Sequence, residues 1–256
     1  ENERPRAGAG SDARDLDRRR VRTDLRARLF GANSAAVVVG RFVLARKLGE
    51  GATSVVFAAF DPDLQREVAL KLVHGIGAGS GAIPEEALAL AKLRHPNVLG
   101  VFEVGVHGAV PFLVTELVSG GTLREFMGEP RTPEERLEIV LGVAEGVAAA
   151  HRAGIVHGDL KPENVLIDAG RARVADFGFA RAFVGGSLGA LTGSGRSGGT
   201  PAYLAPEAIK GIGDGYTADQ YALGVIAYEL IVGLALVCIV IADLIFTVIF
   251  YALKLV

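Results

Sequence analysis

The run His157–Asn164 (HGDLKPEN) and the DFG run that begins at Asp176 carry the side chains that phosphoryl transfer needs. A phosphoryl group in transit needs its negative charge neutralised and the attacking hydroxyl held in line, with little covalent help from the protein. Asp159 can accept the hydroxyl proton, and Lys161 can neutralise the moving phosphate. Asn164 and Asp176 offer the hard oxygen ligands that Mg²⁺ prefers, with Mn²⁺ as a substitute. These residue types predict metal-dependent phosphoryl transfer.

A glycine-rich segment at residues 48–57 (LGEGATSVVF) lies upstream of these runs. Gly49 and Gly51 have no side chain, so their backbone N–H groups can approach phosphates closely. Ser54 stands where the G-x-G-x-x-G pattern has its third glycine. A dinucleotide-binding turn would have to be followed by a helix, whereas residues 55–60 and 67–73 are typical of two strands joined by a turn. The order therefore favours a strand pair that covers phosphates.

HGDLKPEN, DFG and the glycine-rich segment, in this order, resemble the signature of a bacterial Hanks-type serine/threonine protein kinase. The resemblance implies an α+β, two-lobed fold with a small antiparallel-sheet N-lobe and a helical C-lobe. It divides the chain into a polar linker or arm rich in Arg and Asp (1–40), the N-lobe and hinge (41–118), an incomplete C-lobe (119–233) and an apolar tail (234–256).

The resemblance also assigns roles along the N-lobe. A lysine at the end of an apolar strand ordinarily reaches into solvent, but Lys71 in VALK matches the lysine that anchors ATP, with Glu86 on the helix at 85–93 as its partner. Thr115 matches the gatekeeper before a hinge at 116–118. The residues expected to bind ATP are Gly49, Glu50, Gly51, Ala52, Thr53, Ser54, Val56, Ala69, Lys71, Thr115, Glu116, Val118 and Leu166.

Two places indicate which hydroxyl accepts the phosphate. Lys161, two residues after the base, is typical of serine/threonine kinases in the family that the chain resembles. The run at 199–207 (GTPAYLAPE) resembles the acceptor loop of such kinases, in which Thr200 bridges Asp159 and Lys161. Gly158 stands where the family usually has an arginine that pairs with a phosphorylated activation loop. We therefore expect a serine/threonine enzyme whose activity does not depend on that phosphate.

Other elements follow from apolar spacing and cap residues. Residues 98–106 and 110–115 are expected as strands, and 121–126 as the start of a short helix. Thr132–Pro133 begins a helix that runs to about residue 151 and ends before Gly154. The resemblance also implies that residues 216–230 form the family's central helix, on which Asp219 braces the backbone of the catalytic run.

Composition frames these motifs. A chain of 256 residues with 50% hydrophobic residues and net charge -2 has an ample core and no overall nucleic-acid signature. The single cysteine, Cys238, excludes an internal disulfide. Arginines and acids interleave before residue 29, which favours a solvated linker over an arm that binds nucleic acid or a membrane surface. Composition does not indicate an oligomeric state.

The C-terminal segment departs from the family pattern. Residues 231–253 carry only Asp243 as a formal charge and are long enough, as a helix, to cross a hydrocarbon core of about 30 Å. Three interpretations compete: an anchor that holds a cytoplasmic kinase domain at the cell membrane, a foreign tail on a fragment or gene fusion, and a buried helical tail. The family would continue here with further C-lobe helices.

Two functions follow from this combination. The first is a protein kinase that transfers the γ-phosphate of Mg-ATP to Ser or Thr hydroxyls of protein substrates. The alternative is an impaired, nucleotide-binding pseudokinase or scaffold, or a gene fragment, because the C-lobe lacks its last helices. The motifs favour the first, and the C-terminal segment is the reason to keep the second.

Overall fold

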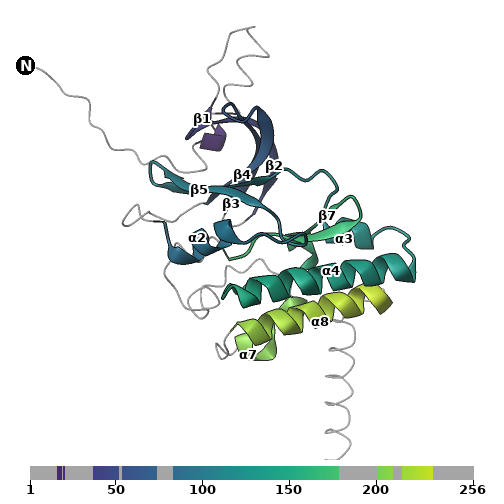
Figure 1. Ribbon diagram of the computed structural model, residues 1–256. Coiled ribbons are helices and arrows are strands. Elements are labelled where there is room, and N and C mark those ends of the chain that lie inside the picture. The colour runs from purple at the N-terminus through teal and green to yellow at the C-terminus, as the bar shows by residue number, and fades with distance from the viewer. Residues whose placement is uncertain are drawn as a thin grey trace, which may run out of the picture. The chain divides into compact units, whose positions relative to one another are not determined.

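The computed structural model describes residues 16–18, 20, 37–51, 54–73, 83–178, 201–209 and 215–232. These residues form two compact units, an N-lobe (described residues up to 93, and 100–117) and a C-lobe (94–99 and the described residues from 118 onward). The expected α+β class with a sheet lobe and a helical lobe is confirmed (Figure 1).

The N-lobe is built on one antiparallel sheet of six strands in the order β1-β2-β3-β4-β6-β5. Its core forms because apolar side chains gather in the strands, as in β4, where Val68, Leu70 and Leu72 are fully buried. The strands are β1 (Val38–Val39), β2 (Phe42–Glu50), β3 (Ser54–Asp61), β4 (Arg66–Val73), β5 (Val101–His107) and β6 (Val110–Glu116). The expected strands at 55–60, 67–73 and 110–115 are confirmed to within a residue.

One expected strand begins late. Residues 98–100 precede β5, because Val98 forms an isolated parallel bridge with Val174 in the C-lobe. The backbone N–H of Leu99 donates to the carbonyl of Val174 (2.8 Å) for the same reason. The short segment 94–99 therefore belongs to the C-lobe, although the N-lobe precedes and follows it in sequence.

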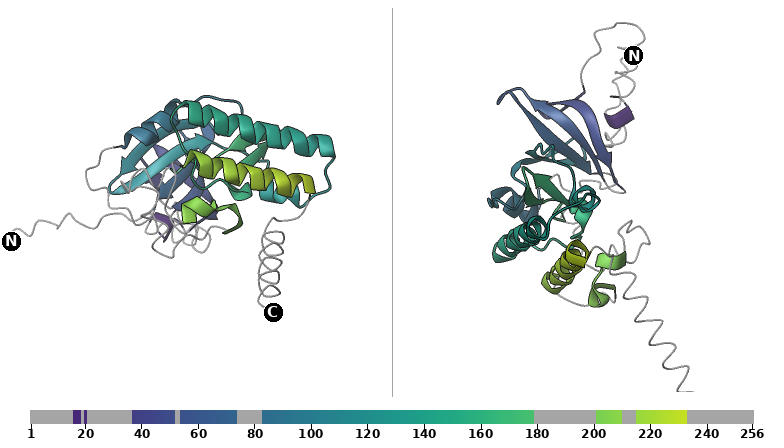
Figure 2. Two further views of the ribbon diagram at one scale, coloured as in Figure 1. Left: turned by 90° about the horizontal axis from the view of Figure 1, so that it is seen from below. Right: turned by 90° about the vertical axis from the view of Figure 1, so that its right-hand side faces the viewer.

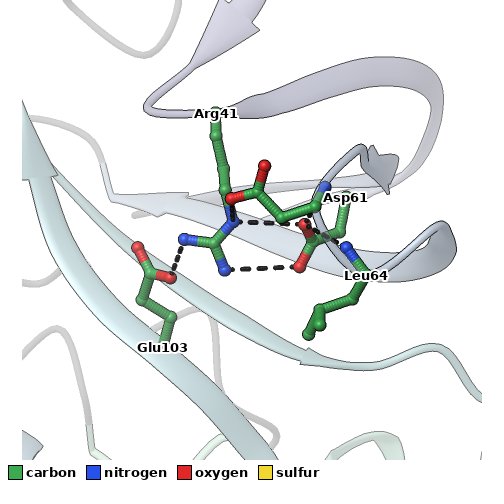
Figure 3. Close-up of polar contacts among 5 residues, drawn as sticks. Arg41, Asp61, Leu64 and Glu103 are labelled. Atoms are coloured by element: carbon green, nitrogen blue, oxygen red, sulfur yellow. Dashed lines mark hydrogen bonds and ion pairs between the residues drawn. The ribbon is translucent and has the colours of Figure 1, made fainter.

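A charge cluster links the turn between β1 and β2 to β3 and β5 (Figure 3). Arg41 donates from Nε to Asp61 Oδ1 (3.1 Å) and from Nη1 to Glu103 Oε2 (2.6 Å). The fully buried Asp61 also accepts the backbone N–H of Asp63 and Leu64, which fixes the turn between β3 and β4. The hydrogen bond from Arg41 lowers the pKa of Asp61. The carboxylate is thus held ionised, and the turn keeps its shape.

The N-terminal arm is not a solvated linker where the structure describes it. Leu16 is 4% exposed and belongs to the core cluster of the sheet. Asp17 accepts from Lys47 Nζ (3.2 Å), and the guanidinium of Arg20 lies 5.5 Å from the ring centroid of Phe57. Asp17 and Arg20 therefore meet partners on β2 and β3, which interleaved charges in a sequence do not reveal. β1 also begins inside the segment that we expected to be a linker.

The C-lobe contains α3 (Leu123–Met127), α4 (Pro133–Arg152), the 3-10 helix η1 (Pro162–Asn164), the hairpin β7 (Val165–Asp168) and β8 (Arg171–Val174), η2 (Pro201–Tyr203), α7 (Pro206–Ile209) and α8 (Tyr216–Val232). The N-lobe also contains the helix α2 (Glu85–Lys92), which contacts β5. The expected N-terminus at Thr132 is confirmed, with a capping box to Glu135 and Pro133 in the first turn. α4 and α8 lie side by side (Figures 1 and 2).

The β7–β8 hairpin is tied to α4 through the buried Asn97. The side chain of Asn97 donates from Nδ2 to the carbonyl of Ala172 (3.0 Å), and its backbone carbonyl accepts the N–H of Val174 (2.8 Å). α4 comes this close because it has glycine at 142 and 146: a Cβ at Gly146 would lie 2.4 Å from the carbonyl oxygen of Asn97. The hairpin positions Asn164 at one end and Ala175 at the other, so this packing supports the site.

Replacement of Gly146 by alanine is expected to destabilise the protein by about 1–3 kcal/mol, because the methyl group must displace backbone. Gly224 on α8 is the matched control, since a Cβ there meets nothing within 4 Å. Gly224→Ala is expected to stabilise the protein by about 0.5–1 kcal/mol through helix propensity alone. Urea unfolding of both variants measures the difference; equal free energies of unfolding would contradict the close approach at Gly146.

α8 ends at Val232, and residues 233–256 lie outside the described residues. The expected apolar helix over 231–253 therefore falls almost wholly in that segment. Among the helices that the structure describes, none combines the length and apolarity that crossing a membrane requires.

Candidate active site

Asp219 organises the catalytic loop, residues 157–164. Its side chain is 1% exposed and accepts the backbone N–H of His157 at Oδ2 and of Gly158 at Oδ1, both at 2.7 Å. His151 at the end of α4 donates from Nε2 to the same Oδ2 (2.8 Å). The expected bracing of the loop by Asp219 is confirmed, and three donors compensate the burial of its charge.

The backbone at Gly158 is left-handed, with φ of 68°. Glycine adopts this conformation readily, whereas a residue with a side chain adopts it only at a cost. In this conformation the N–H groups of residues 157 and 158 both donate to Asp219. The substitution of the usual arginine by glycine is therefore compatible with the shape of the loop.

Three of the candidate catalytic side chains meet within the loop. Lys161 Nζ donates to Asp159 Oδ2 (2.7 Å), and Asn164 Nδ2 donates to the same oxygen (3.1 Å) and to the carbonyl of Asp159 (2.7 Å). The side chain of Asp159 is 51% exposed, so an acceptor hydroxyl can reach it. The carboxylate thus has a fixed orientation and an open side, which a general base needs.

The metal-ligand candidates are brought together by the hairpin. Asn164 precedes β7 and Asp176 follows β8, and the backbone N–H of Ala175 donates to the carbonyl of Asn164 (2.9 Å). Because Nδ2 of Asn164 donates to Asp159, its Oδ1 is the amide atom that can coordinate a cation. Asp176 is exposed and has φ of 61°, an uncommon backbone conformation for a residue other than glycine.

This donor set fits Mg²⁺ bound together with a nucleotide. Two oxygen-bearing side chains leave most coordination positions for phosphates and water, as Mg²⁺ sites on nucleotides usually do. Within the part of the chain that the structure describes, no group of three or more His, Cys, Asp or Glu side chains could hold a metal ion.

His157 is fully buried beneath the loop and links it to the segment before Asp176. Its Nε2 donates to the carbonyl of Ala175 (2.8 Å), and its Nδ1 accepts the backbone N–H of Asp159 (3.2 Å). Its ring lies 4.8 Å from that of Phe177. The hydrogen bond that Nδ1 accepts requires the neutral imidazole, and burial lowers the pKa of His157 despite the nearby carboxylates of Asp219, Asp159 and Asp176.

This histidine predicts a pH dependence. Because the pKa of His157 is lower in the folded protein than its unfolded value of 6.5, the unfolded chain binds more protons as the pH falls below 6.5. The contribution of His157 is complete above that pH and is lost as the pH falls, at no more than about 1.4 kcal/mol per pH unit. Urea unfolding between pH 7.5 and 5.5 should show a shallower slope for His157→Gln; equal slopes would contradict the assignment.

The N-lobe carries most residues expected to bind ATP. Gly49 pairs with Val56 across the β2–β3 turn, and the backbone N–H of Gly51 donates to the carbonyl of Ser54 (2.8 Å). The strand register sets Val56 opposite Lys71, and Ala69 opposite Thr115. The adjacent strands β2, β3, β4 and β6 thus carry Gly49, Val56, Ala69, Lys71 and Thr115. Glu50 is exposed at the same turn, and Ala52 and Thr53 lie outside the described residues.

The remaining predicted site residues lie in different parts of the structure, and not all of them are described. Glu86 is exposed in the first turn of α2, and its pairing with Lys71 stays a prediction. Glu116 accepts the backbone N–H of Gly100 at Oε1 (2.9 Å), so its side chain is used inside the lobe. Val118 and Leu166 lie in the C-lobe, and Thr200 lies outside the described residues.

Sequence reasoning missed two polar side chains that hold this region together. His151 anchors Asp219, and Arg124 on α3 contacts Glu163 in η1. A histidine in the last turn of a helix, and a lone arginine on a short helix, are ordinary surface features. No pattern in the sequence distinguishes them, because their partners are up to 105 positions away.

Comparison with known proteins decides the family. Residues 42–244, well over half of the chain, match the protein kinase domain. The chain belongs to the protein kinase domain family. The resemblance to bacterial Hanks-type kinases is thereby confirmed, because the similar kinases include several from bacteria.

Serine/threonine-protein kinase PknL of Mycobacterium tuberculosis is 40% identical to this kinase-family chain over 206 residues, covering 78% of the chain and 51% of PknL. PrkC of Bacillus subtilis is 34% identical over 203 residues, covering 77% and 31% respectively. The crystal structure of the kinase domain of Mycobacterium tuberculosis PknI superposes with a TM-score of 0.63 and 27% identity, over 80% of this chain and 78% of that one. The chain spans about half the length of PknL and less of PrkC.

Proposed function

We propose that this chain is a serine/threonine protein kinase that transfers the γ-phosphate of ATP to hydroxyl groups of protein substrates, with Mg²⁺ or Mn²⁺. The observation that carries the proposal is the exposed Asp159 carboxylate, oriented by Lys161 and Asn164 on a loop that Asp219 fixes. The names of the relatives, all serine/threonine-protein kinases, support the same activity.

Each residue of the proposed site has a separate role in the transfer. Asp159 accepts the proton of the acceptor hydroxyl as the oxygen attacks, and Lys161 neutralises the transferring phosphoryl group. Asn164 and Asp176 would hold the divalent cation, whose charge offsets that of the β- and γ-phosphates. The β2–β3 turn and Lys71 would position the ATP phosphates. The acceptor is Ser or Thr because Lys161 and the loop at 199–207 have the serine/threonine pattern.

Gly158 supports a proposal about regulation. The chain has no arginine at this position, so a phosphate on the activation loop lacks its usual partner there. The catalytic loop is held by Asp219 instead, through backbone groups that need no phosphate. We expect phosphotransfer without prior phosphorylation of the loop.

Transfer of radiolabelled phosphate from ATP to myelin basic protein tests the function. Lys71→Met should lower the transfer at least a hundredfold, because the ammonium that positions the phosphates is lost. Lys92→Met at the exposed end of α2 is the matched control and should leave transfer unchanged. Undiminished transfer by Lys71→Met would contradict the site. ATP binding without transfer by the unaltered chain would favour the scaffold alternative.

Anchoring in the cell membrane stays a prediction from residues 231–253, of which Ile231 and Val232 are described and exposed. An anchored kinase domain should remain in the membrane fraction at high salt and be released by detergent. Release by salt alone would exclude the anchor.

A further inference from the structure

The guanidinium of Arg124 joins four segments of the C-lobe. From α3, its Nε donates to Glu163 Oε1 in η1 (3.0 Å), its Nη1 to Glu229 Oε1 in α8 (2.6 Å), and its Nη2 to the Tyr203 hydroxyl at the end of η2 (2.6 Å). Each of its three nitrogens thus serves a different element. Arginine is suited to this task because its donors have a fixed planar arrangement.

The cluster is closed by a further hydrogen bond from the Tyr203 hydroxyl to Glu229 Oε2. The side chain of Glu229 is 11% exposed, and Tyr203 is buried. Burial and the hydrogen bond to Glu229 raise the pKa of Tyr203. The hydroxyl therefore stays protonated and donates to Glu229 while it accepts from Arg124. By comparison, an isolated and exposed ion pair contributes little to stability, because no further hydrogen bonds join its members into a network.

The residues that Arg124 contacts lie both in the proposed catalytic loop and in the segment next to the expected acceptor contact. Glu163 is adjacent to the metal-ligand candidate Asn164 in η1. Tyr203 lies three residues after Thr200, in the segment 201–205 that follows the expected acceptor contact. Glu229 is on α8, the helix that also carries Asp219. Arg124 is thus the side chain that ties the acceptor segment, residues 201–205, to the catalytic loop and to its supporting helix.

We propose that Arg124 is a positioning residue for the protein acceptor: it holds residues 201–205 against the catalytic loop so that the acceptor hydroxyl reaches Asp159. This proposal rests on the proposed kinase function. The hydrogen bonds of Arg124 go to Glu163, Glu229 and Tyr203, none of which is proposed to hold the cation or ATP, so its loss should affect the acceptor and leave ATP binding unchanged. Because Arg124 ties these segments without a phosphate, it also provides order that does not depend on loop phosphorylation.

Arg131 is a matched control for a merely structural contribution. It lines the same cavity of about 320 Å³ as Arg124. Its guanidinium lies 4.4 Å from the ring centroid of Phe126 and pairs with Glu129 in the same loop. These contacts hold only the α3–α4 connection. Loss of general packing would therefore affect Arg124→Ala and Arg131→Ala alike.

Steady-state kinetics of the full chain separate the two roles. Arg124→Ala should raise KM for myelin basic protein at least tenfold, with KM for Mg-ATP and the rate of ATP hydrolysis without acceptor changed less than twofold. Arg124→Lys keeps the charge and a single donor nitrogen, so its effect should lie between that of Arg124→Ala and the unaltered chain. Tyr203→Phe removes the shared hydroxyl, so its effect and that of Arg124→Ala should not add. Equal losses in both KM values, or an equal effect of Arg131→Ala, would overturn the proposal.

Hydrogen–deuterium exchange gives a second measurement that does not need activity. Arg124→Ala should increase exchange in residues 201–205 and 162–165, and Arg131→Ala should not. Unchanged exchange in Arg124→Ala would overturn the positioning role even in an active kinase. An unaltered chain that binds ATP but transfers no phosphate would refute the proposed function, and the exchange measurement would still decide whether Arg124 orders the acceptor segment.

Discussion

Asp159→Asn is expected to lower kcat for phosphotransfer about a thousandfold and to leave ATP affinity within twofold of the unaltered chain. General-base catalysis contributes roughly 10²–10⁴-fold, and an amide cannot accept the hydroxyl proton. Asn is nearly isosteric with Asp, and its carbonyl oxygen can still accept from Lys161 Nζ and Asn164 Nδ2, as Asp159 Oδ2 does. The loop should therefore keep its shape, and the loss should be chemical.

The control for this variant is Asp168→Asn on β7. Asp168 is also a partly exposed carboxylate in an ion pair, with Arg173 Nη2 at 2.9 Å, and it lies in the same lobe. It takes no part in the proposed chemistry, so kcat should be unchanged. The measurements are initial rates with myelin basic protein at saturating ATP, and ATP binding by calorimetry. A loss of less than tenfold in Asp159→Asn would show that another group takes the proton.

The side chains proposed to act in the catalytic loop could be predicted from the sequence because they lie close together in it. Asp159, Lys161 and Asn164 lie within six consecutive residues, and the structure joins them directly. The same holds for helix starts, since the capping box at Thr132 and Glu135 is formed within one turn. Where the interacting residues are neighbours in sequence, residue types and spacing suffice to predict the contact.

Longer-range features were predicted less well. The interleaved charges before residue 29 suggested a solvated linker, but one apolar side chain, Leu16, enters the sheet core. The strand expected from residue 98 begins at Val101, because pairing with Val174 takes Val98 into the other lobe. In both cases the decisive partner is distant in sequence. Composition indicates whether a segment tends to be exposed or buried. These outcomes depend instead on which other elements the tertiary structure brings next to the segment.

Arg124 and His151 show the same limit at the site. Both are polar side chains on helices, and solvent would satisfy either one. Their contacts with Glu229 and Asp219 span 105 and 68 positions and arise because α3, α4 and α8 pack in one lobe. The residues proposed to perform the chemistry are thus readable from the sequence, while those that hold them in place emerge only with the tertiary structure.

Asp219→Ala is expected to cost about 3–5 kcal/mol of stability and to abolish phosphotransfer. Removal of one partner from a buried charged hydrogen-bond group leaves the others uncompensated. Here the backbone N–H groups of His157 and Gly158 and the His151 ring lose their acceptor together. With both N–H groups released, the left-handed turn at Gly158 loses the contacts that hold it, and Asp159 loses its fixed direction.

Asp219→Asn separates folding from positioning if the alanine variant fails to fold. The amide keeps the side-chain volume and one acceptor oxygen, so it can serve one of the two N–H groups while its NH₂ faces the other. We expect a smaller loss of stability, of about 1–3 kcal/mol, and a kcat reduced at least tenfold in a folded protein. Gln220→Ala, at an exposed position on the same helix, is the control and should change neither quantity. Urea unfolding followed by circular dichroism gives the stability, and initial rates give kcat. A folded Asp219→Asn variant with unaltered kcat would show that these hydrogen bonds do not position the loop for catalysis.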